Sequence, residues 1–175
     1  DQIICTSYAK SINYKNNLNL NDHVSFIDVG FNKTSIISYL NEKIVAINIL
    51  PIGSNHITKD ISKVLKINLD KSEQAKLNFD QNPEILNKKN ASQNILKKII
   101  FARTEEILEL CKKSIKSNLF LTNMPKMILT GEGSRILAYK YKDEISSPNN
   151  INFLEETLED ICQSGFKFIS QPNKQ

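Results

Sequence analysis

Three consecutive apolar, β-branched runs joined by short turns constrain the fold of this chain more than any other feature. The runs cover Val24–Val29, Thr34–Leu40 and Ile44–Leu50, with turns at 30–33 and 41–42. Turns this short connect antiparallel strands, because parallel strands need a long crossover. The sequence therefore predicts a β-meander. Its third run is almost continuously apolar, which favours a central strand buried on both faces.

The rest of the chain alternates between helical and strand patterns. Helices are predicted at Ile3–Tyr14, His56–Leu65 (with Ser54 or Asn55 as N-cap), 70–79, 93–117, 135–141 and Leu154–Cys162 (with Gly165 near its C-cap), and further strands at Lys126–Leu129 and 150–153. Phe166, Phe168 and Ile169 alternate as along a strand edge. The predicted fold class is α/β, with a mixed five-stranded sheet in the order β-β-β-α-β-α-β-α flanked by helices.

The composition limits the classes of protein to which this chain can belong. The 175 residues suit one domain with a small subdomain, and 40% hydrophobic residues supply a core. The net charge is +4, but no basic block carries interleaved aromatic residues, so nucleic-acid binding is not predicted. Cys5, Cys111 and Cys162 are odd in number and far apart, which argues against disulfides or a zinc site and fits a reducing cytoplasm. A first residue other than Met, Asp1, suggests a piece of a longer protein.

An acid at the end of the first strand, followed by a glycine turn, is the main candidate for chemistry. Gly30 removes a side chain where a ligand could approach, and successive backbone N–H groups in such a turn bind anions. Asp28 could hold a divalent cation through water or orient an attacking water. On its own, however, Asp-x-Gly at a strand end is most often a simple turn.

Other candidates have simple structural explanations. His56 is interpreted as a helix-start or packing residue, because no Cys or acidic cluster stands near it. Glu73 and Lys76 alone would be an ordinary exposed helix pair, and Arg103 alone would be solvated surface. Neither a G-x-x-x-x-G-K-[ST] string nor a G-x-S-x-G string occurs, so P-loop and serine-hydrolase chemistry are not supported.

Three separated segments carry a resemblance to a known family. They are Asp28-Val29-Gly30 with Thr34, the string PIGSNHITKDI at 51–61, and ILTGEGS at 128–134. The set resembles the second half of the actin/Hsp70/sugar-kinase ATPases, which have a ribonuclease H-like fold, and within them the FtsA family of bacterial cell division. Glu73 and Lys76 match the family's E-x-x-K, and Arg103 with Glu106 matches its R-x-x-E-I.

The resemblance implies ATP and Mg²⁺ as cofactors. The implied nucleotide-binding residues are Asp28, Gly30, Asn32, Thr34, Gly53, Glu73, Lys76, Gly131, Glu132, Gly133 and Ser134. Asp28 would be the catalytic residue and would hold Mg²⁺ through water. Asn32 stands where the family usually has a second glycine, and Glu132 stands where glycine is more frequent.

The resemblance also implies a domain division and a function. Residues 1–79 and 118–170 would form the actin-like subdomain 2A, 80–117 a shortened helical subdomain 2B, and 171–175 a polar tail. The protein would bind ATP with at most slow hydrolysis and self-associate into actin-like filaments. It would also tether FtsZ to the membrane, with Arg103 and Glu106 in contact with FtsZ. It would lie in the cytoplasm, peripheral at the inner face of the cell membrane at the division site, attached to the membrane by segments absent from this chain. The alternatives are a small-molecule kinase or active ATPase of the superfamily, and a division pseudo-ATPase that no longer binds nucleotide.

Overall fold

The computed structural model describes residues 5–17, 23–81, 91–119, 124–131, 133–141, 151–154 and 158–170. The elements in chain order are α1 (Thr6–Asn17), β1 (Val24–Val29), β2 (Thr34–Leu40), β3 (Lys43–Leu50), α2 (Ser54–Leu65), α3 (Leu69–Gln81), α4 (Ala91–Leu119), β4 (Lys126–Thr130), α5 (Ser134–Tyr141), β5 (Ile151–Phe153) and α6 (Leu158–Ser170). The predicted α/β class and the predicted order of elements are confirmed.

One mixed five-stranded sheet, in the order β3-β2-β1-β4-β5, forms the centre of the molecule. The pairs β1–β2 and β2–β3 are antiparallel, as the short turns predicted, whereas β1–β4 and β4–β5 are parallel. In this register Asp28 lies opposite Thr130 of β4. The ends of β1 and β4, and the loops that follow them, therefore lie at the same edge of the sheet.

The prediction that the third strand is central was wrong. β3 is the edge strand of the sheet, and Val45, Ile47 and Ile49 are 42%, 58% and 61% exposed. An apolar run indicates a strand, but it does not show whether neighbouring strands pair with both of its edges. Since β1 pairs with β4, which arrives much later in the chain, β1 is the central strand.

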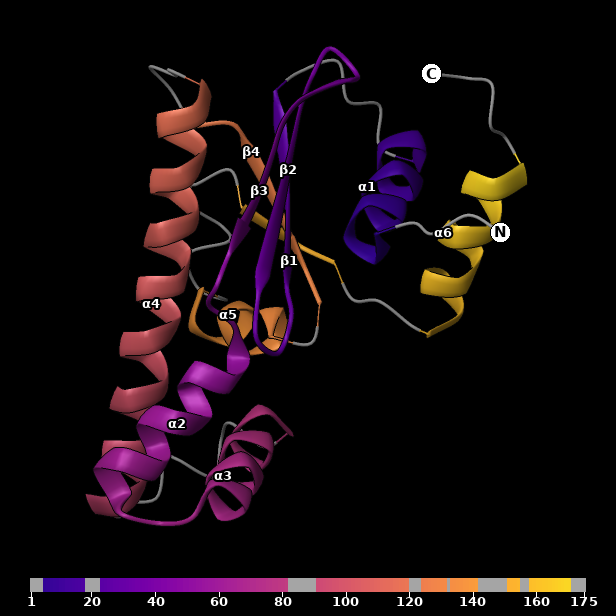
Figure 1. Ribbon diagram of the computed structural model, residues 1–175. Helices are drawn as coiled ribbons and strands as arrows, with labels where there is room; N and C mark the ends of the chain where they lie inside the picture. The colour runs from indigo at the N-terminus through magenta and orange to yellow at the C-terminus, as the bar shows by residue number, and fades with distance from the viewer. Residues whose placement is uncertain are drawn as a thin grey trace.

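Helices cover both faces of the sheet because successive strand residues point to opposite sides. On one face Ile27 and Val29 pack with Ile107 and Cys111 of α4. On the other, Phe26 packs among aromatic residues of β2 and α1. Figure 1 shows α4 along one side of the sheet and α1 with α6 on the other.

A third apolar cluster joins α2, α3 and α4 at the foot of the molecule (Figure 1). Its buried members include Ile57 and Ile61 of α2, Phe79 of α3 and Ile100 of α4. The predicted subdomain boundary at residue 117 falls inside α4, whose C-terminal half packs in the core of the sheet. The division into subdomains stays a prediction.

The C-terminal helix differs from the prediction. We expected it to end near residue 162 and be followed by a strand-like edge, but α6 runs from Leu158 to Ser170. Gly165 lies inside this helix and is not its C-cap. The Ser164 hydroxyl donates 2.6 Å to the Asp160 carbonyl, one turn back, and α6 packs on α1. Packing against another helix outweighs the modest helix cost of one glycine.

Candidate functional site

Three loops that lie far apart in the sequence meet at the end of β1. The Ser54 backbone N–H donates to the Gly30 carbonyl at 3.0 Å, and the Asn55 N–H donates to the Phe31 carbonyl at 2.8 Å. The Gly133 N–H donates to the Val29 carbonyl at 2.9 Å. The β1–β2 hairpin therefore holds both the loop before α2 and the loop before α5 through main-chain hydrogen bonds.

Glycines make these close approaches possible. A Cβ on Gly53 would lie 2.6 Å from the Phe31 carbonyl oxygen and still closer to that of Gly30. A Cβ on Gly131 would overlap the Asp28 carboxylate, and the φ of +88° at Gly131 is also unfavourable for other residues. A Cβ on Gly133 would lie 2.9 Å from the Val29 carbonyl oxygen. Gly53, Gly131 and Gly133 are thus required by these close contacts, whatever the site binds.

The hairpin turn is closed by its own contacts. The Gly30 N–H donates to the Lys33 carbonyl at 3.0 Å, and the buried Thr34 hydroxyl donates to the Ile52 carbonyl at 2.7 Å. The Asn32 side chain accepts a hydrogen bond from the Asn55 amide at 2.9 Å. Neither Gly30 nor Asn32 has a positive φ, so Asn32 replaces glycine here without backbone strain.

The start of α2 is built without the predicted side-chain cap. Its N-cap is Gly53 and not Ser54 or Asn55. The His56 Nδ1 accepts the Gly53 N–H at 3.2 Å, so His56 has the helix-start role that the sequence predicted. The first N–H groups of α2 instead donate to the hairpin carbonyls of Gly30 and Phe31. They are therefore satisfied within the chain.

Lys76 is buried next to these loops, beside the partly exposed Glu73. Lys76 is 3% exposed, and its Nζ lies 2.8 Å from Glu73 Oε2 and 3.0 Å from the Thr58 hydroxyl. The ammonium also lies 3.4 Å from the Ser54 carbonyl and 5.6 Å from the centroid of the Phe31 ring. The pair is thus not the exposed surface pair that its sequence alone would suggest, and it adjoins both α2 and the hairpin.

Asp28 has two partners on α1 that the sequence did not reveal. The Ser7 hydroxyl donates to Asp28 Oδ2 at 2.6 Å, and the Lys10 ammonium lies 3.3 Å from Oδ1. The spacing of Ser7 and Lys10 puts both on one helix face, but only the packing of α1 on the sheet brings that face to β1. Asp28 reaches the Gly131 turn as well, so it joins α1, the hairpin and the third loop.

The predicted Mg²⁺ at Asp28 stays a prediction, and the carboxylate already has partners within the chain. Both carboxylate oxygens are engaged by α1, and the Lys10 ammonium already supplies a positive charge that would repel a second cation. Within the described part of the chain, no group of three or more His, Cys, Asp and Glu side chains could hold a metal.

Arg103 is engaged within the chain. Its Nε lies 2.5 Å from Asp60 Oδ2 on α2, and its Nη1 lies 2.6 Å from Glu106 Oε2. The hydrogen bond to Asp60 raises the pKa of Arg103 further above its usual value. The residue therefore links α4 to α2, while about a quarter of its side chain remains exposed.

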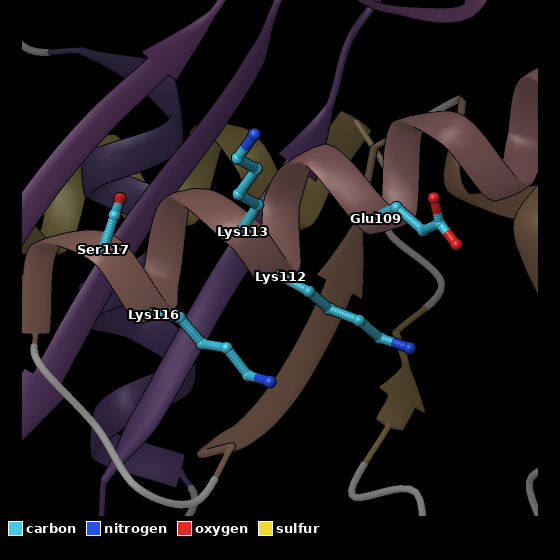
Figure 2. A pocket seen from close by; sticks show the side chains of 5 residues that line it. All are labelled: Glu109, Lys112, Lys113, Lys116 and Ser117. Atoms are coloured by element: carbon cyan, nitrogen blue, oxygen red, sulfur yellow. The ribbon is translucent and has the colours of Figure 1, made fainter.

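Figure 2 shows a shallow hollow on the C-terminal half of α4. It is lined by Glu109, Lys112, Lys113, Lys116 and Ser117. None of these residues was predicted to be functional. Of the predicted site residues, Glu132 lies outside the described residues. Ser134 is buried at the start of α5, where its hydroxyl donates to the Gly131 carbonyl at 2.7 Å.

The sheet order, with helices on both faces and glycine loops at the end of β1, defines an actin-like ATPase fold. A PilM–PilN type IV pilus biogenesis complex superposes with a TM-score of 0.66 over 95% of this chain and 49% of that chain, at 15% identity. MreB5 of Spiroplasma citri bound to AMPPNP gives a TM-score of 0.65 over 97% of this chain and 59% of that chain, also at 15% identity. At this identity the likeness concerns the fold alone.

The chain belongs to the FtsA family, because the family described as cell division protein FtsA matches residues 25–167. It is 30% identical over 124 residues to cell division protein FtsA of Bacillus subtilis, which covers 62% of this chain and 28% of that protein. It is 28% identical over 181 residues to the Borreliella burgdorferi protein of the same name, covering 89% and 44%. The chain thus spans less than half the length of these relatives.

Proposed function

We propose that this chain is the nucleotide-binding half of a cell-division actin that binds ATP at the three-loop junction. The observation that carries this proposal is the convergence of Gly30, Gly53 and Gly131 at the end of β1. These contacts hold the hairpin, the loop before α2 and the loop before α5 together at one edge of the sheet, where the family resemblance places the nucleotide. Glu73 and Lys76 would flank the ribose and adenine, while Gly133 and Ser134 would pass beneath the adenosine.

The proposed cellular role is to polymerise into actin-like filaments and tether FtsZ to the membrane at the division site. None of the described helices is both long and apolar enough to cross a membrane. The proposed location is the cytoplasmic side of the cell membrane at the division site. The face of α4 that carries Arg103 and Glu106 is proposed to contact FtsZ, and self-association would follow from the actin-like fold.

Photocrosslinking tests the nucleotide site directly. The complete protein is irradiated with 8-azido-ATP, and labelled peptides are identified by mass spectrometry. We expect labelling within 69–81 and 131–141, suppressed by excess ATP, and none within 109–117, which lines the hollow on α4. Labelling that ATP does not suppress, or labelling confined to other segments, would refute the proposed site.

A matched pair of variants, Arg103→Glu and Arg135→Glu, tests the proposed contact with FtsZ. Only Arg103→Glu should abolish co-sedimentation with FtsZ.

A further inference from the structure

Phe31, at the tip of the β1–β2 hairpin, carries an aromatic ring that a ligand at the three-loop junction can reach. The residue is 51% exposed, whereas Thr34, Lys76 and Ser134 are buried there. The polar atoms of these buried side chains are already bonded within the chain. A ligand therefore meets the Phe31 ring without any rearrangement of the junction.

The backbone of Phe31 is fixed by the loop before α2. Its carbonyl accepts the Asn55 N–H at 2.8 Å, and the preceding carbonyl of Gly30 accepts the Ser54 N–H at 3.0 Å. Gly53 lies so close that a Cβ there would stand 2.8 Å from the Phe31 carbonyl carbon. The ring is thus attached to a backbone that two hydrogen bonds and a close contact hold in place.

A buried ammonium group supports the ring. The Lys76 Nζ lies over the Phe31 ring, 5.6 Å from its centroid, and a cation is attracted to an aromatic face by the ring quadrupole. The three N–H donors of Lys76 have three acceptors, which are Glu73 Oε2 at 2.8 Å, the Thr58 hydroxyl at 3.0 Å and the Ser54 carbonyl at 3.4 Å. Lys76 therefore acts on a ligand through the ring that it supports.

An exposed aromatic ring on a fixed backbone is a surface on which a flat aromatic ligand stacks. Stacking needs an open ring face and no enclosed cavity, and it removes both rings from water. We propose that Phe31 is the base-stacking residue of the nucleotide site, with Lys76 supporting the ring from the other side. This inference rests on the proposed function and deepens it, because it names the group that binds the base. Stacking uses the face of a base and not its hydrogen-bonding edge, so Phe31 should contribute equally to binding of adenine and guanine nucleotides.

Nucleotide affinities of the complete protein test the inference. Titration calorimetry gives the dissociation constants of ATP, of GTP and of tripolyphosphate, which has no base. Phe31→Leu keeps an apolar side chain but loses the ring, so it should weaken ATP and GTP binding by the same factor, about fivefold or more, and leave tripolyphosphate binding unchanged. Phe31→Tyr, which restores a ring, should bind as wild type does. Phe166→Leu is the matched control, because Phe166 is 74% exposed on α6, and it should also bind as wild type does.

Fluorescence separates direct stacking from an indirect effect on the hairpin. The 175 residues contain no tryptophan, so Phe31→Trp places a new fluorophore at the stacking position. Its emission, after subtraction of the wild-type signal, should be quenched by ATP and GTP but not by tripolyphosphate. A Phe31→Trp protein that binds ATP without quenching would overturn the inference. So would a Phe31→Leu protein with unchanged affinity, or one with tighter binding, which would mean that the ring blocks the site. A wild-type protein that binds no nucleotide would instead refute the proposed function, and this inference with it.

Discussion

Replacing Gly53 with alanine tests whether the hairpin and the start of α2 are in the close contact described above. The new Cβ would lie 2.6 Å from the Phe31 carbonyl oxygen and closer to the Gly30 carbonyl oxygen. Both obstacles are backbone atoms, which cannot move aside as the end of a flexible side chain can. The φ of −161° at Gly53 is open to any residue, so the effect would arise from this contact alone.

The magnitude follows from the contacts that must give way. Overpacking a close contact costs about 1–3 kcal/mol, and the hydrogen bonds from Ser54 and Asn55 to the hairpin contribute about 1 kcal/mol each. We therefore expect Gly53→Ala to lower the free energy of unfolding by about 2–4 kcal/mol. With an urea m-value near 2 kcal/mol/M, the midpoint of unfolding would fall by about 1–2 M.

Urea denaturation followed by circular dichroism measures this shift, and the chain offers a matched control. Gly165 lies inside α6, and a Cβ there would meet no atom within 4 Å. Gly165→Ala should therefore raise the free energy of unfolding by about 0.5–1 kcal/mol, the usual helix gain over glycine. A Gly53→Ala protein within about 0.5 kcal/mol of wild type would refute the close contact between the hairpin and α2.

Two further predictions concern side chains away from the loops. Burial raises the pKa of Cys111 to about 12, so at pH 8 a thiol reagent such as dithionitrobenzoate should label the exposed Cys5 and Cys162 at once and Cys111 only on unfolding; rapid labelling of all three would contradict this. The pKa of Cys111 in the folded state exceeds the unfolded value of 9, so its contribution to stability is complete below pH 9 and is lost as pH rises toward 12. The free energy of unfolding should fall by up to about 1.4 kcal/mol per pH unit in this range, and Cys111→Ala should flatten that slope. Arg103→Ala should lower the free energy of unfolding by about 1 kcal/mol, because the Asp60 pair that joins α2 and α4 is only partly buried. Replacing the exposed Arg135 with alanine should change the free energy of unfolding by less than half of that, and equal effects would mean that the Asp60 pair contributes nothing.

The predicted strands and most helices depend on local pattern, and for that reason they could be predicted from the sequence. Three short-looped β-branched runs allow little except a meander, and the apolar spacing of 93–117 gives α4 within two residues at each end. The predicted ends of helices were wrong where tertiary packing outweighed local preference. Helix α6 continues through Gly165 because it packs on α1, and α2 begins at Ser54 because the hairpin carbonyls of Gly30 and Phe31 accept its first N–H groups.

The sequence by itself was enough to identify the family, because the glycines, acidic residues and short motifs that carry the resemblance are local and follow one another in a recognisable order along the chain. Only the tertiary structure decided what each residue touches. The sequence did not reveal that Ser7 and Lys10 contact Asp28, because only the packing of α1 on the sheet brings these two residues to β1. Likewise β3 became an edge and β1 the centre when β4 paired with β1 from across the chain. Long-range contacts of this kind depend on the packing of whole elements, which no window of the sequence contains.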